Sequence, residues 1–144
     1  MKKIYLASPF FNAEELAVYK ETIRRLRAAG YAVFVPQEHE IPNAWDYSNA
    51  VWAQKVFEMD AQAILDCDTV MVLNFGMYSD SGTAWEAGYA AALHKDVVQV
   101  LCGYENATYS LMMIGGCRKV VAVDNVENWE EMSAAIDLDK IIQK

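Results

Sequence analysis

The chain of 144 residues is 54% hydrophobic and carries a formal net charge of −8 at pH 7. This length and apolar content predict a single compact domain over residues 1–144, without repeats or linkers. The acidic balance argues against a nucleic-acid partner, because phosphate contacts require clustered Lys and Arg. The apolar run near the N-terminus is too short for a signal peptide or a membrane span, and the three cysteines lack metal-site spacing. We therefore expect a reduced, cytoplasmic protein with no membrane partner.

Five short apolar runs separated by helical patterns predict an α/β fold. The predicted strands cover residues 4–7, 31–35, 68–73, 97–101 and 120–123. The predicted helices cover residues 13–29, 45–67, 83–93, 106–114 and 128–136. Asn12 is expected to cap the first of them. Strands that alternate with helices predict a doubly wound, five-stranded parallel sheet with helices on both faces and the flavodoxin-like order 2-1-3-4-5.

The predicted topology locates a site. Ligands of such a sheet bind beyond the carboxyl ends of the strands, where the winding reverses between the first and third strands. Ser8-Pro9-Phe10 follows the first strand, and Asp80 and Glu86 follow the third. The polar loop 37–43 after the second strand is long, and long loops in compact domains tend to be functional. We expect these segments to converge at one edge of the sheet.

Glu86 is the one charged residue of the helix predicted over residues 83–93. We expect it in the first turn, where a carboxylate complements the partial positive charge of a helix N-terminus. A second interpretation is that the helix end keeps an anionic nucleophile ionised at the mouth of a site. Glu86 alone does not decide between the two.

Two further carboxylates are expected near Glu86. Asp60 lies beside the buried stripe of the helix predicted over residues 45–67, and Asp80 lies where the next helix starts. Carboxyl groups that share a pocket of low dielectric cannot all ionise cheaply, so one should hold a proton near neutral pH. Cleavage of a glycosidic bond needs this combination of a nucleophilic carboxylate and a protonated carboxyl group. The other interpretation is a surface residue for Asp60 and a helix cap for Asp80.

Aromatic side chains are expected around these carboxylates. Tyr5, Phe10 and Trp52 can reach them, and their flat faces suit a leaving group such as a nucleobase. The usual cofactor signatures are absent from the sequence: no GxGxxG follows a strand, no GxxxxGK[ST] occurs, and no zinc-ligand pair is recognisable. We therefore expect neither a cofactor nor a metal ion.

Three stretches of the chain resemble the nucleoside 2-deoxyribosyltransferase family, and the similarity spans essentially the whole chain. The first is Tyr5-Leu-Ala-Ser-Pro-Phe-Phe11, and the second is Asn49-x-x-Trp52-x-x-x-Val56-Phe57-x-x-Asp60. The third and most specific is Asp80-Ser-Gly-Thr-Ala-Trp-Glu86-x-Gly88-Tyr89-Ala90.

The resemblance implies roles for the carboxylates. Glu86 would be the nucleophile of a covalent 2-deoxyribosyl intermediate, and the β configuration would be retained after a second base attacks. Tyr5 would orient Glu86. Asp80 and Asp60 would contact the base and the sugar, with Asp80 as the group that carries a proton to and from the base nitrogen, although the division between the two aspartates stays open. The implied reaction exchanges one nucleobase of a deoxynucleoside for another, and such a reaction belongs to nucleotide salvage.

The resemblance also implies substrate contacts from two subunits. Ser8, Phe10 and Trp52 would belong to one pocket, whereas an Asn-x-Met element of a neighbouring subunit contacts the sugar 5′-hydroxyl in this family. Ser110-Leu-Met112 stands at the matching place, with serine instead of asparagine. We therefore expect a homo-oligomer, which the apolar helix over residues 83–93 also favours.

Two alternatives follow. A serine at position 110 also resembles the related deoxynucleoside 5′-monophosphate N-glycosidases, where it helps to bind phosphate, and this makes nucleotide hydrolysis the first alternative. Against it, Asp80 fits the transferase motif better, and residues 8–12 lack the arginine and glycines of a phosphate cradle. The second alternative is a non-catalytic nucleotide-binding module on the same fold. The sequence favours the transferase, whose substrates are a deoxynucleoside and a free nucleobase.

Overall fold

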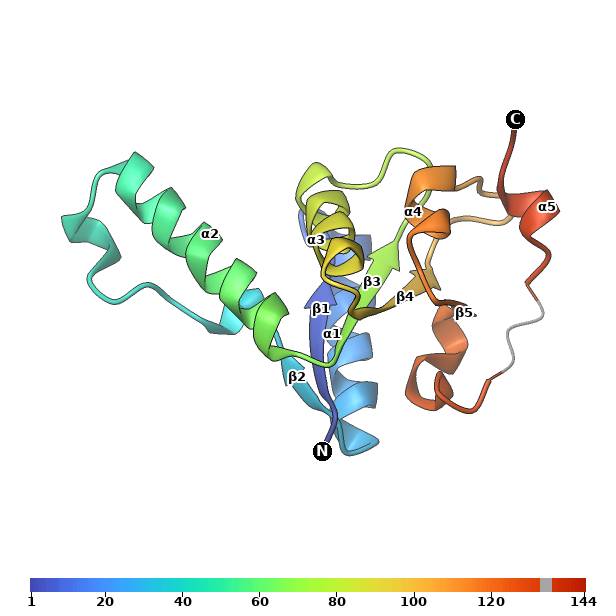
Figure 1. Cartoon of the computed structure of the whole chain (residues 1–144), viewed down its shortest axis with the longest axis horizontal. Helices are drawn as coiled ribbons and strands as arrows, with labels where there is room; N and C mark the ends of the chain where they lie inside the picture. Colours follow the sequence, from blue (N-terminus) through green and yellow to red (C-terminus); the bar gives the residue numbers. More distant parts are fainter. Residues whose placement is uncertain (133–135) are drawn as a thin grey trace.

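The computed structural model describes residues 1–132 and 136–144 and is built on a five-stranded, all-parallel sheet (Figure 1). The strands are β1 (Lys3–Ala7), β2 (Ala32–Phe34), β3 (Thr69–Asn74), β4 (Asp96–Leu101) and β5 (Lys119–Ala122). Their order is β2-β1-β3-β4-β5, which confirms the predicted topology. Each strand lies within one residue of its predicted ends.

The helices depart further from prediction. The α-helices are α1 (Ala13–Ala28), α2 (Asn49–Asp66), α3 (Ser81–Ala92), α4 (Leu111–Gly115) and α5 (Leu138–Ile141). Three 3-10 turns join them: η1 (Pro36–Glu38), η2 (Ala44–Asp46) and η3 (Val123–Asn128). Asn12 caps α1 as predicted, by accepting a hydrogen bond from the Glu15 amide.

Three predicted helices need correction. The second begins at Asn49 rather than at residue 45, because the Ser48 hydroxyl caps it there. The fourth is reduced to the single turn of α4. Of the helix predicted over residues 128–136, residue 128 ends η3, residues 129–131 form a turn, and residues 133–135 lie outside the described part of the chain.

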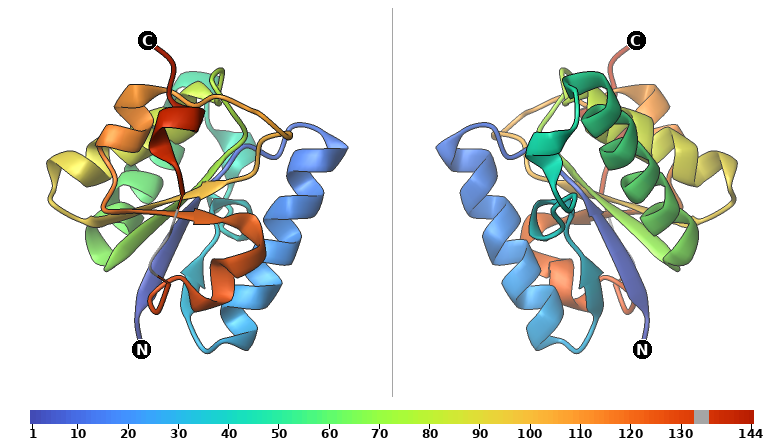
Figure 2. Two further views of the ribbon diagram at one scale, coloured as in Figure 1. Left: turned by 90° about the vertical axis from the view of Figure 1, so that its right-hand side faces the viewer. Right: turned by 90° about the vertical axis from the view of Figure 1, so that its left-hand side faces the viewer.

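Helices cover both faces of the sheet (Figure 2). α1 and η3 pack on one face, where the core includes Ile4 and Leu6 of β1. α2, α3 and α4 lie on the other face, and there Tyr5 and Ala7 of β1 join the core. This alternation is that of a β-strand, in which successive side chains point to opposite faces. Tyr5 therefore points toward the helices that carry Asp60 and Glu86.

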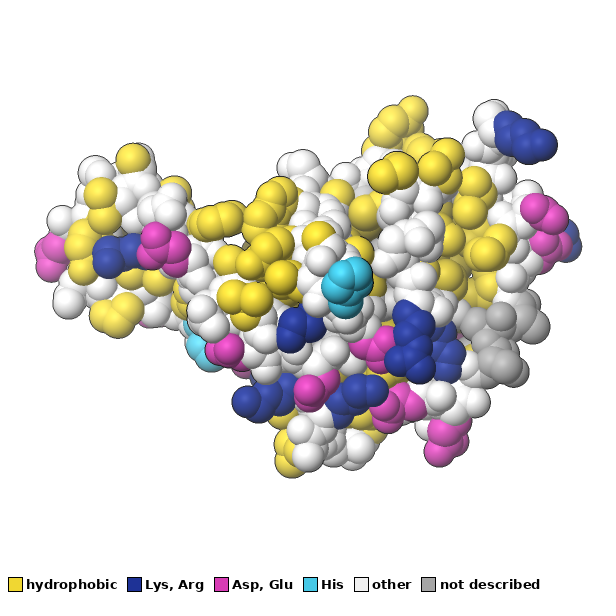
Figure 3. Space-filling view, viewed as in Figure 1, with side chains coloured by type: hydrophobic (Ala, Val, Ile, Leu, Met, Phe, Trp, Pro, Cys, Tyr) yellow, Lys and Arg dark blue, Asp and Glu magenta, His cyan; other side chains and the backbone are white. Residues whose placement is uncertain are grey.

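The first half of α2 and the segment before it project away from the sheet as an arm (Figure 1). Ile64, near the C-terminus of α2, is fully buried, but Val51 and Trp52 of the predicted buried stripe are exposed. Hydrophobic side chains also gather on the surface over α3 and its border with α4 (Figure 3). Among the described residues no helix is both long and apolar enough to cross a membrane.

Candidate functional site

The first turn of α3 is organised by Asp80, which lies just before the helix. Its Oδ2 accepts hydrogen bonds from the Thr83 amide at 2.8 Å and from the Thr83 hydroxyl at 3.0 Å. The sequence predicted Glu86 in the first turn of the helix. This N-cap starts the helix at Ser81, so Glu86 lies in the second turn instead. Since the effect of the helix dipole falls off within the first turn, the helix end is not what sets the ionisation of Glu86.

Burial sets the ionisation of Glu86 instead. Burial of its carboxyl group raises the pKa, the Tyr5 hydroxyl lowers it, and the charges of Asp60 and Asp80 raise it; together these effects bring the pKa of Glu86 to about 7. Close to neutral pH this group is therefore a mixture of acid and anion. The raised pKa of Glu86 is thus what one expects if neighbouring carboxyl groups share a proton near neutral pH.

Tyr5 lies at the centre of the sheet, paired with Phe34 of β2 and Val70 of β3. Its ring stacks on that of Phe34, with the centroids 5.5 Å apart. Burial, and next the charge of Glu86, raise the pKa of the Tyr5 hydroxyl well above its ordinary value, so the group stays protonated. Among the described residues it has no hydrogen-bond partner of good geometry, although it lies close enough to Glu86 to affect its ionisation. Tyr5 is therefore a fixed donor beside Glu86.

Asp60 lies on α2, and its side chain is half-buried. Its Oδ1 is shielded from solvent and lacks a hydrogen-bond partner among the described residues. Burial raises the pKa of this carboxyl group, and the charge of His39 partly opposes that rise. Asp60 is thus a carboxyl group with one unpaired buried oxygen, in contrast to the capping carboxylate of Asp80.

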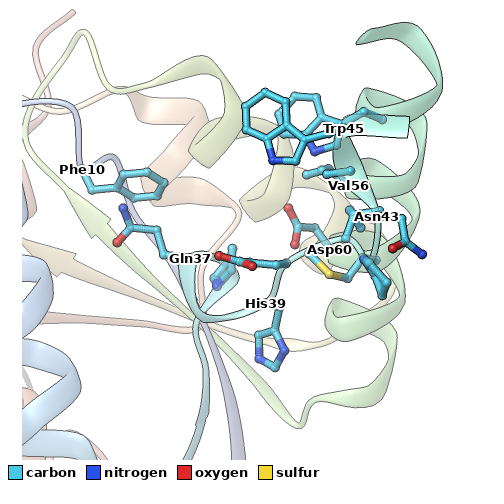
Figure 4. Close-up of a pocket in the computed structure, with 14 residues that line it drawn as sticks. Phe10, Gln37, His39, Asn43, Trp45, Val56 and Asp60 are labelled. Atoms are coloured by element: carbon cyan, nitrogen blue, oxygen red, sulfur yellow. The ribbon is translucent and has the colours of Figure 1, made fainter. Parts of the chain in front are cut away.

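A cavity of about 740 Å³ opens beside Asp60. Its walls come from the loop after β1, from the segment between β2 and α2, and from α2 itself. The lining residues are Phe10, Pro36, Gln37, His39, Glu40, Ile41, Pro42, Asn43, Ala44, Trp45, Trp52, Val56, Met59 and Asp60. Figure 4 shows Phe10 and Gln37 on one side of the cavity and Trp45 and Asp60 on the other. The space suits a flat ring held between aromatic walls.

Of the predicted site residues, Phe10, Trp52 and Asp60 line the cavity. Tyr5, Asp80 and Glu86 are not among its lining residues, but the charge of Asp60 raises the pKa of both Tyr5 and Glu86.

Three other predicted residues lie apart from the cavity lining. The hydroxyl of Ser8 is buried and donates to the Pro9 carbonyl at 2.7 Å. Ser110 precedes α4 and makes no side-chain capping bond, and Met112 of α4 is 78% exposed. Within a single chain these last two do not contribute to the cavity.

Sequence reasoning missed most of the segment between β2 and α2. Gln37, Glu40, Asn43 and Trp45 all line the cavity. The signal was the length of the polar loop, which pointed to function without indicating which side chains face inward.

Comparisons with known proteins identify the family of the chain. The family described as nucleoside 2-deoxyribosyltransferase matches residues 4–135. The chain is 31% identical to a solved 2-deoxyribosyltransferase from Bacillus psychrosaccharolyticus, with a TM-score of 0.78 over 99% of this chain and 97% of that one. No match was found among curated proteins.

Two more distant solved structures share the fold. The CMP N-glycosidase of Clostridium botulinum is 21% identical, with a TM-score of 0.59 over 92% of this chain and 100% of that one. A 2-deoxyribosyltransferase from Leishmania mexicana is 24% identical, with a TM-score of 0.54 over 81% of this chain and 73% of that one. At these identities the likeness extends to the fold alone.

Proposed function

The chain belongs to the nucleoside 2-deoxyribosyltransferase family, and from this premise we propose that it moves a 2-deoxyribosyl group from one nucleobase to another through a covalent intermediate on Glu86. The observation that carries the proposal is the pKa of Glu86, which burial raises to about 7 beside a second carboxyl group, Asp60, whose pKa is also raised. A nucleophile and a proton donor can therefore coexist near neutral pH. Base exchange of this kind belongs to nucleotide salvage.

In the first half-reaction the Glu86 carboxylate attacks C1′ of the donor nucleoside. The bond from C1′ to the base nitrogen breaks, and the departing base takes a proton from a neighbouring carboxyl group. The Tyr5 hydroxyl, held by the stack of its ring on Phe34, orients the carboxylate by donating toward it. In the second half-reaction an incoming base returns its proton to the same carboxyl group and attacks C1′, which releases Glu86 and retains the β configuration.

We assign the proton to Asp60 and a substrate-contacting role to Asp80. One Asp80 oxygen already accepts two hydrogen bonds from Thr83 and is therefore engaged in the helix cap. The buried Oδ1 of Asp60 has no partner among the described residues, and burial raises the pKa of this carboxyl group. This inverts the division of roles that the sequence favoured.

We also propose a homo-oligomer in which Ser110 and Met112 complete the site of a neighbouring subunit. Met112 is exposed and Ser110 makes no capping bond, so both are free to contact another chain. Trp85 of α3 is 46% exposed, although its ring already packs on Phe57 and Tyr89. Exposed apolar side chains such as Met112 and Trp85 are typical of an interface between protein chains.

A base-exchange assay tests the proposal. The protein is incubated with deoxycytidine and free adenine, and we expect deoxyadenosine and cytosine as products. Glu86→Gln should abolish the exchange, whereas Asp46→Asn, a change at an acidic residue outside the cavity, should not. Binding of nucleosides without turnover would instead support a non-catalytic binding module.

The second candidate is hydrolysis of deoxynucleoside 5′-monophosphates, which Ser110 favours. Against it, none of the cavity residues in the described part of the chain is Lys or Arg, so a phosphate group would lack the side chains that usually bind it. A strong preference for 5′-phosphorylated donors, with free base and sugar phosphate as products and a loss of that preference in Ser110→Ala, would support the hydrolase.

A further inference from the structure

Two glutamates of the segment between β2 and α2 have different surroundings. Glu38 forms an ion pair with Arg27, in which the Arg27 Nη2 lies 2.6 Å from the Glu38 Oε2. Glu40, two residues later, lines the cavity and makes no hydrogen bond or ion pair with the residues that the structure describes. Glu40 is therefore a carboxylate available to a ligand.

The residue before Glu40, His39, is held in place by an aromatic stack. The His39 ring stacks on Phe34, with centroids 4.3 Å apart and planes 6° from parallel, and it points away from Asp60 and Phe10 (Figure 4). His39 has extended backbone angles, φ −117° and ψ 110°. Glu40 directly follows this stacked residue, and both residues are part of the cavity lining.

The other polar groups of the cavity are less selective than Glu40. The side-chain amides of Gln37 and Asn43 can each donate or accept a hydrogen bond. Asp60 is assigned to proton exchange, and in that role it alternates between donor and acceptor. The carboxylate of a glutamate such as Glu40, by contrast, has no donor of its own and only accepts.

We propose that Glu40 makes this cavity selective for bases that carry an exocyclic amino group, namely adenine and cytosine over hypoxanthine and uracil. The inference rests on the proposed function, since it concerns the base that occupies the cavity. A base stacked between the aromatic walls presents its edge to the polar groups, and an amino group on that edge donates to a carboxylate. An oxo group at the same position places an acceptor against an acceptor, and this leaves both unpaired.

The test compares two amino bases with their oxo counterparts, which differ in this group and in the proton on the ring nitrogen beside it. The rate of exchange from one common donor, deoxyguanosine, is measured with adenine against hypoxanthine and with cytosine against uracil. We expect kcat/KM to favour the amino base by about three- to tenfold, the range for one partly exposed hydrogen bond to a charged group. In Glu40→Gln, which keeps the size of the side chain but adds a donor, both ratios should fall toward one. Asp46→Asn is the matched control and should leave them unchanged.

Direct binding of the four free bases, measured by calorimetry, separates this inference from the proposed function. If no base is exchanged but adenine and cytosine bind more tightly than their oxo counterparts, the exchange reaction is wrong and the inference stands. Equal affinities and equal rates for each pair would overturn the inference even if exchange occurs. Ratios that are unchanged in Glu40→Gln would overturn it as well, because the selectivity would then come from another residue.

Discussion

The Asp80 carboxylate and Thr83 form the N-cap of α3, joined by bonds of 2.8 Å to the amide and 3.0 Å to the hydroxyl. This contact fixes where the helix begins, and so it fixes which side of the helix Glu86 occupies. Asp80 therefore has a structural role as the cap of α3, in addition to its proposed contact with the substrate.

We predict that the two tasks of Asp80 separate in different variants. Asp80→Ala loses the cap and should lower the free energy of unfolding by about 1 kcal/mol. Asp80→Asn keeps an oxygen that can accept from the Thr83 amide, so its stability should stay close to that of the wild type while exchange slows. Thermal unfolding and the exchange rate, measured on both variants, test this. Equal destabilisation by Asn and Ala would show that the cap depends on the charge.

The raised pKa of Glu86 predicts a pH-dependent cost in stability. Below about pH 4.5, its ordinary pKa, the group is protonated in both the folded and the unfolded chain. As the pH rises toward about 7 the unfolded chain loses this proton first, so the folded state becomes relatively less stable, by at most about 3 kcal/mol. Glu86→Gln removes this cost. Urea unfolding should find the variant more stable than the wild type at pH 8 and no more stable at pH 4. A constant difference across this range would contradict the assignment.

Tyr5→Phe is predicted to raise the pKa of Glu86 further. The Tyr5 hydroxyl opposes the effect of burial on Glu86, and its removal leaves that effect unopposed. Stability should change little, because the hydroxyl is buried without a well-formed hydrogen bond among the described residues. Carbon-13 NMR titration of labelled glutamate carboxyl groups, with Glu86→Gln to assign the signal, measures the shift. An unchanged or lower pKa would mean that Tyr5 does not act on Glu86.

The exposed face of α3 predicts self-association. Trp85→Glu should shift the protein toward smaller assemblies in light scattering and should reduce exchange, because the neighbouring subunit would no longer supply Ser110 and Met112. Leu138→Glu is the matched control, since Leu138 of α5 is exposed to the same degree, 45% against 46% for Trp85. Full activity of a monomeric Trp85→Glu protein would contradict the shared site.

The sheet was predictable because buried parallel strands leave continuous apolar runs in the sequence. The side-chain environment of α2 was not. Trp52 fits the apolar stripe of the helix, yet it is exposed at the cavity, because helical periodicity does not distinguish a core from a surface that binds a ligand or another subunit. The starting point of α3 was missed by part of a turn, since capping depends on which of several polar residues accepts from the helix.

The cavity itself was the least predictable part. Glu40 and Asn43 lie in a loop without periodicity, where the direction of a side chain depends on backbone angles that only the folded chain defines. The stack of His39 on Phe34 holds this loop in place, and a contact between residues of unrelated pattern leaves no signature in a single sequence.

The central claim is that Glu86 carries the sugar. The most direct measurement is mass spectrometry of the protein quenched during turnover with a deoxynucleoside donor and no acceptor base. We predict a mass increase of one 2-deoxyribosyl group on the peptide that contains Glu86, released when a second base is added and absent from Glu86→Gln. An active enzyme that never carries this adduct, or that carries it on another residue, would contradict the account.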